Sequence, residues 1–170
     1  MLRLVGAGML LAASAALGLS AAGELTARVR DLEQLILAIK SMEWELHSKR
    51  SLLPEVLRRT MSCMTGNVKE FYLLCISRLE RKEGVPFSQI WEQAAEAAPL
   101  HLNDTDRALL LEVGRILGRS DADSQCIALK ETRERLTRAL EDAREEKNRM
   151  GRVYGMLGIT AGSFLAIILI

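Results

Sequence analysis

The chain has 170 residues, of which 49% are hydrophobic and 26% are charged, and its formal net charge is +1. This balance, without any strip in which arginines alternate with aromatic residues, argues against a nucleic-acid-binding protein. Cys63, Cys75 and Cys126 are odd in number and lack C-x-x-C spacing. They indicate reduced core thiols rather than the disulfide framework of a secreted protein.

Uncharged runs stand near both ends of the chain, at residues 4–23 and 153–170. Each is long enough to cross a hydrocarbon core, which needs about 20 residues of apolar helix. We therefore expect an N-terminal transmembrane helix at 1–23 and a C-terminal one at 153–170. The first run is rich in Ala and Gly, so an alternative stays open in which it is a signal peptide that is cleaved.

Basic residues beside the two runs predict the orientation. Only Arg3 lies on the outer side of a run. Five basic residues face the interval between the runs: Arg28, Arg30, Lys147, Arg149 and Arg152. Since cytoplasmic flanks carry the excess of positive charge, we expect residues 24–152 in the cytoplasm.

Residues 24–152 are long enough for one domain with a core, and their periodicity is helical. Apolar residues recur every three or four positions from Leu25 to Leu46, which predicts a long helix continuing from the first apolar run. A second long helix is expected from residue 121 to the end of the chain, antiparallel to the first. Its apolar seam consists of Leu129, Leu136, Leu140 and Ala143.

Between the long helices, breaks rich in Gly, Pro and Asn delimit four shorter ones. They are expected at residues 54–65, 67–82, 86–98 and 104–117. The sequence thus predicts an all-α protein, with a single cytoplasmic bundle of about six helices between two transmembrane helices.

A corner is predicted where the fourth short helix meets the last long one. Gly114 and Gly118 share a helix face that a neighbouring helix can approach closely, and Gly118 suits a helix end. Asn103 with Asp106, and Ser120 with Asp123, have the spacing of an N-cap and an acidic residue three positions later. The corner is either purely structural, or it presents Asp121 and Gln125 as part of a docking surface.

Residues with catalytic or metal-binding spacing are lacking. His47 and His101 have no ligand at metal-binding spacing, and the sequence contains no phosphate-binding glycine loop. Glu43 and Glu45 lie two positions apart and point to different helix faces, so a solvated or partner-binding role is favoured over acid–base catalysis. We expect no enzyme activity, no metal and no cofactor.

The run "HLNDTDRALLLEVGRILGRSDADSQ", residues 101–125, with its paired glycines followed by Ser-Asp, resembles the stage III sporulation protein AB family of endospore-forming bacteria. Three further stretches are similar to that family: "LEQLILAIKSMEWEL", "IWEQA" with Trp91, and the closing "EKNRMGRVYGMLGITAGSFLAIILI". The stretch "HSKRSLLPEV" departs from it, because family members tend to have a Tyr-Gly and a Thr-Pro-Leu turn there.

The resemblance implies a protein of the mother-cell membrane around the forespore, in the sporulation channel that links the two cells. It implies a cytoplasmic bundle similar to that of the platform protein of type II secretion and type IV pilus systems. The implied partners are the channel's secretion-type ATPase, its AA member, other channel membrane proteins and the lipid bilayer. The alternative from another class is an exported, tail-anchored envelope scaffold or binding module.

Overall fold

The structure is a computed structural model. It describes the backbone of residues 2–49, 52–81, 84–117 and 122–169, and the side chains of residues 22–47, 52–81, 84–117, 124–151 and 153.

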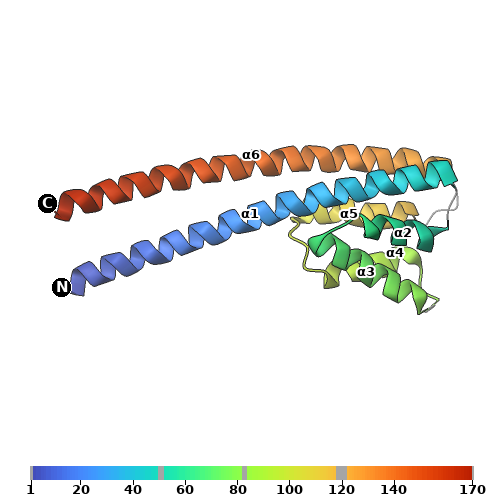
Figure 1. The fold of residues 1–170 in the computed structure, drawn as a ribbon, viewed down its shortest axis with the longest axis horizontal. Coiled ribbons are helices and arrows are strands. Elements are labelled where there is room, and N and C mark those ends of the chain that lie inside the picture. The colour runs from blue at the N-terminus through green and yellow to red at the C-terminus, as the bar shows by residue number, and fades with distance from the viewer. Residues whose placement is uncertain (1, 50–51, 82–83, 118–121, 170) are drawn as a thin grey trace.

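Within these residues the fold consists of six α-helices and contains no strand, which confirms the all-α prediction. The helices are α1 (Leu2–Lys49), α2 (Leu53–Ser62), α3 (Gly66–Glu80), α4 (Phe87–Ala97), α5 (Asp104–Leu117) and α6 (Ala122–Leu169). The long helices α1 and α6 run antiparallel and side by side, and both termini lie at the same end of the molecule (Figure 1). The four short helices pack against the other end of this pair.

Local signals set the helix boundaries. The Asn103 side chain accepts a hydrogen bond from the Asp106 backbone N–H at 2.8 Å, and the Asp106 carboxylate accepts one from the Asn103 N–H at 3.3 Å. This reciprocal capping box fixes the start of α5 where the sequence predicts it. Pro54 stands in the first turn of α2, where its missing N–H costs nothing. Gly66 begins α3 with a φ of +60°, a conformation that glycine adopts readily.

The core lies between the paired long helices and the short ones. On α6, the predicted apolar seam forms one side of this core: Leu129, Leu136 and Ala143 are fully buried, and Leu140 is nearly so. On the far side of the core, Phe71 and Trp91 meet edge to face with ring centroids 4.7 Å apart. Burying such side chains contributes about 1.5–3 kcal/mol each, so the seam and this aromatic group hold the six helices together.

The cysteines differ in their surroundings. Cys75 is buried in α3, and burial raises the pKa of its thiol well above the usual range. Cys126 is partly buried, whereas Cys63 is exposed. The prediction of core thiols is therefore confirmed for Cys75 and wrong for Cys63, which follows the last residue of α2 and turns away from the core.

Among the helical residues whose side chains are described, no stretch is long and apolar enough to cross a membrane. The predicted spans at 1–23 and 153–170 lie almost entirely outside those residues, so they stay predictions.

Candidate functional site

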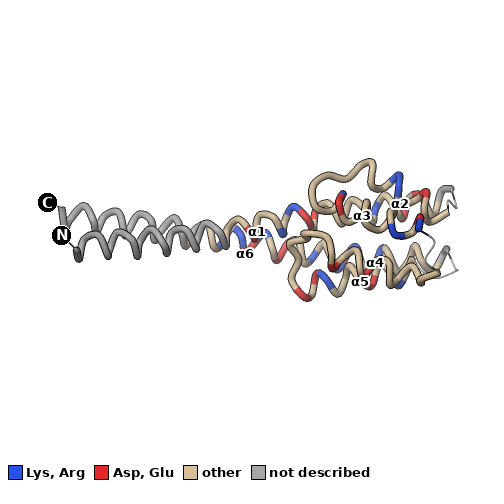
Figure 2. The backbone as a smooth tube through the Cα atoms, turned by 90° about the horizontal axis from the view of Figure 1, so that it is seen from below, with Lys and Arg blue, Asp and Glu red and all other residues tan. Residues whose placement is uncertain are grey.

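A cluster of charged residues lies where the loop before α5 packs against α1 and α6. Figure 2 shows acidic and basic residues intermingled along both long helices in this part of the molecule. A pocket opens here between α1 and the loop, and it is lined by Glu24, Leu25, Arg28, Leu100, His101, Leu102 and Asn103. Two segments that are distant in the sequence thus contribute charged or polar side chains to one pocket.

An ion pair between Arg28 and Asp106 forms the centre of this cluster. Arg28 Nε donates to Asp106 Oδ2 at 2.7 Å and Nη2 donates to Oδ1 at 3.2 Å. The Asp106 side chain is fully buried and that of Arg28 is 13% exposed, while Glu146 of α6 lies 3.3 Å from Arg28 Nη1. The hydrogen bond to Asp106 raises the pKa of Arg28, which keeps the guanidinium charged. One arginine of α1 therefore connects α5 with α6.

Asp31 fixes the loop to α1 from the other side. It is 3% exposed and accepts hydrogen bonds from the His101 backbone N–H at 2.9 Å and from the Asn67 amide at 3.2 Å. The His101 ring lies between two carboxylates, with Nδ1 3.3 Å from Asp31 and Nε2 3.7 Å from Glu24. His101 is therefore a bonded part of the cluster.

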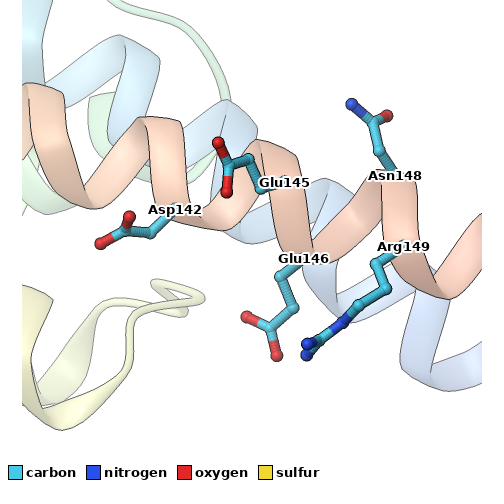
Figure 3. A pocket seen from close by; sticks show the side chains of 5 residues that line it. All are labelled: Asp142, Glu145, Glu146, Asn148 and Arg149. Atoms are coloured by element: carbon cyan, nitrogen blue, oxygen red, sulfur yellow. The ribbon is translucent and has the colours of Figure 1, made fainter.

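A second pocket lies beside the cluster, and the lining residues among those that the structure describes all belong to α6. Figure 3 shows Asp142, Glu146 and Arg149 projecting from one side of the helix, whereas Glu145 and Asn148 project from the other. Within the described side chains, no group of His, Cys, Asp and Glu residues is arranged to hold a metal ion. The carboxylates here are suited to pairing with cations, as Glu146 already does with Arg28.

The two predicted partner-binding glutamates of α1 point to different neighbours. Glu43 accepts a hydrogen bond from Arg133 of α6 at 2.9 Å. Glu45 accepts one from Arg59 of α2 at 3.0 Å. The prediction that they occupy different faces is confirmed. Glu45 is only 6% exposed and faces α2 rather than water, so the solvated role, one of the two that we expected, does not apply to it.

The close approach predicted at Gly114 is confirmed. A Cβ atom at this position would lie 2.6 Å from Trp91 Cγ and 2.9 Å from Trp91 Cβ. The buried Trp91 indole N–H also donates to the Leu110 carbonyl oxygen at 2.8 Å, one turn before Gly114. Trp91 therefore lies against the backbone of α5 and positions α4 on it.

The remaining residues of the predicted corner are described only in part. Gly118, Ser120 and Asp121 lie outside the described residues. Gln125 is 7% exposed, so it is buried rather than presented on the surface, as one of the two interpretations of the corner required. It lies on the seam side of α6, four positions before the fully buried Leu129.

Sequence reasoning missed the charged cluster because its members are far apart in the chain. Arg28 counted only as a basic flank of the first apolar run, and Asp106 only as a capping residue. One signal was present: Asp31 lies four positions before the buried Leu35, on the side of α1 that carries apolar residues. A carboxylate at such a position needs a partner, which identifies it as part of a buried network.

Comparisons with known proteins agree with the resemblance noted in the sequence. The sequence model of the stage III sporulation protein AB family matches residues 3–170. A solved structure described as "Stage III sporulation protein AB (SpoIIIAB)" is similar in fold, with a TM-score of 0.64 and 20% sequence identity. The similarity covers 72% of this chain and 98% of that one. No curated protein matches the chain.

Proposed function

The chain belongs to the stage III sporulation protein AB family, and from this premise we propose that it is a non-catalytic platform component of the sporulation channel. In this role it is anchored in the mother-cell membrane around the forespore and couples the membrane complex to a cytoplasmic secretion-type ATPase, the AA member of the same group. Its other partners are the membrane proteins of the channel and the lipid bilayer.

One observation supports this proposal above others: the long helices α1 and α6 connect both apolar runs to the same helical bundle. Glu33 of α1 and Arg144 of α6 pair at 2.6 Å, and Glu43 and Arg133 pair at 2.9 Å. The charged cluster adds a third connection, which also includes α5. A coupling part must hold its two ends in a fixed relation, and the ion pairs between α1 and α6 support this proposed role.

The proposed ATPase surface is the corner between α5 and α6, for which the sequence offers Asp121 and, four positions later, the buried Gln125. Glu43 and Glu45 are the next candidates, although their carboxylates are engaged by Arg133 and Arg59. Glu43 and Glu45 come second because each carboxylate already pairs with an arginine of the same chain.

The side of the membrane on which the helical bundle lies tests the proposed cytoplasmic location. In sporulating cells, a membrane-impermeant maleimide should leave a cysteine placed at exposed Lys40 or Lys130 unlabelled until the membrane is permeabilised. The exposed Cys63 is first replaced by Ser, so that it does not contribute a signal. Labelling in intact cells would contradict the cytoplasmic location and favour the exported, tail-anchored scaffold. The mass of the mature chain shows whether the first run is removed.

Charge reversal tests the ATPase part. Asp121→Arg should abolish co-purification with the ATPase, because like charges would then meet across the interface. The matched control is Glu134→Arg, which reverses an exposed charge further along α6 and should leave co-purification intact. Circular dichroism checks that both variants remain helical. Full ATPase binding by Asp121→Arg would rule out this corner as the docking site.

A further inference from the structure

The acidic residues of α1 are turned toward other parts of the chain. Each of the four carboxylates that this helix carries between residues 30 and 47 bonds to another segment: Asp31 to Asn67 and His101, Glu33 to Arg144, Glu43 to Arg133, and Glu45 to Arg59. Three of these carboxylates are paired with arginines of other helices, and the fourth, Asp31, is buried.

The outer face of the same stretch carries cationic and apolar side chains. Its exposed residues are Arg30, Leu37, Lys40, Trp44 and His47. Their spacing of seven, three, four and three residues places them on one face of the helix, as in the seam of a coiled coil. Because Glu33, Glu43 and Glu45 are paired with arginines and Asp31 is buried, Arg30 and Lys40 give this outer face a positive character beside its apolar residues.

Leu37 and Trp44 are the large apolar residues of this face, and they are 51% and 57% exposed. They lie two helical turns apart, with Lys40 between them. An exposed apolar residue that stands alone is ordinary on a protein surface, and Leu52 just before α2, Leu73 on α3 and Ile127 on α6 are examples. Two such residues in helical register on one face are typical of a helix-binding surface instead.

We propose that the outer face of α1 binds an acidic amphipathic helix of a partner protein. Two apolar residues of the partner helix, seven positions apart, would pack on Leu37 and Trp44. Carboxylates flanking them would meet Arg30 and Lys40, and this charge complementarity selects an acidic partner over a basic one. The inference does not depend on the proposed ATPase corner, which lies at the turn between α5 and α6.

A pair of designed peptides tests this inference. Both are amphipathic helices of three heptads with the same leucine seam, but one is flanked by glutamates and the other by lysines. The full chain is held in phosphatidylcholine nanodiscs, and Trp44 serves as the reporter because the other tryptophan, Trp91, is fully buried. The acidic peptide should shift the emission to the blue in a saturable and salt-sensitive manner, and the basic peptide should not.

Variants locate the binding surface. Leu37→Ser and Lys40→Glu should each weaken binding of the acidic peptide about tenfold or more, as expected for central interface residues. The matched controls are Leu73→Ser and Lys69→Glu, which make the same changes on the exposed side of α3 and should leave binding unchanged. The Trp44→Phe variant should lose the emission change.

Three outcomes would overturn the proposal. The first is that the acidic peptide does not bind, and the second is that both peptides bind equally well. The third is self-association of the chain in the absence of peptide that Leu37→Ser abolishes, because the occupant would then be a second copy. None of these results bears on binding of the ATPase at Asp121.

Discussion

At the scale of single residues, the contact between Gly114 and Trp91 determines how closely α4 and α5 approach each other. Trp91 is fixed on its other faces by Phe71 and Tyr72, whose ring centroids lie 4.7 Å and 5.8 Å from its own, and by its hydrogen bond to Leu110. The indole therefore has little room to move away from α5. A side chain at position 114 has to displace a buried aromatic group.

Gly114→Ala should lower the free energy of unfolding by about 1–3 kcal/mol, because the added methyl group overlaps the Trp91 ring. Unfolding of the full chain in detergent, followed by near-ultraviolet circular dichroism, measures this loss. The control is Gly151→Ala on α6, where a Cβ would meet nothing within 4 Å. It should stabilise the helix by up to about 1 kcal/mol. Equal effects of the two substitutions would show that the Gly114 face is not tightly packed.

The sequence indicated this glycine but not its neighbour. A glycine inside an apolar helical pattern predicts close approach, and that inference needs only local information. Trp91 precedes Gly114 by 23 residues, and which helix fills the space depends on how α4 turns back against α5. For the same reason, the sequence left open whether Gln125 lies on the surface, and the packing of α6 buries it.

At the scale of helices, the connection of α5 to α1 depends on one buried ion pair, Arg28 with Asp106. Arg28→Met removes the cation but leaves a fully buried carboxylate, so it should destabilise the chain by about 3–5 kcal/mol. Adding Asp106→Asn should recover part of this loss, because the remaining amide is neutral. Chemical unfolding of the two single variants and the double variant gives the coupling between the residues.

An exposed pair on the short helices provides the control for this prediction. Arg58 and Glu80 are 57% and 53% exposed in their side chains. Arg58→Met should therefore cost less than about 1 kcal/mol. If Arg28→Met costs no more than Arg58→Met, the Arg28–Asp106 pair does not hold α5 in place.

The helices themselves were largely predictable, whereas the contacts between them were not. The bounds of α5 agree with the prediction because a capping box marks its start, and the ends of α2, α3 and α4 lie within three residues of the predicted ones. The partners of Arg28 and Asp31 could not be predicted, since they come from segments more than 35 residues away in the sequence. Periodicity identifies the buried face of a helix but does not identify its neighbour.

At the scale of the whole molecule, α6 completes a core that begins with α1 more than a hundred residues earlier. Leu129, Leu136, Leu140 and Ala143 supply the α6 side of that core. A chain that ends after Leu117 would leave the apolar stripe of α1 exposed on this side. It should therefore lose cooperative thermal unfolding, as followed by circular dichroism at 222 nm. A sharp transition near that of the full chain would show that the first five helices form an independent unit.

The ion pairs between the long helices also limit how those helices can move. Arg28 with Glu146, Glu33 with Arg144 and Glu43 with Arg133 connect them at three levels. These levels span about 22 Å of α1, at about 1.5 Å per residue. Axial slip of one helix along the other would have to break all three pairs at once. A tilt of both helices as one unit breaks none of these ion pairs. A force applied at the loops would therefore move the far ends of α1 and α6 together.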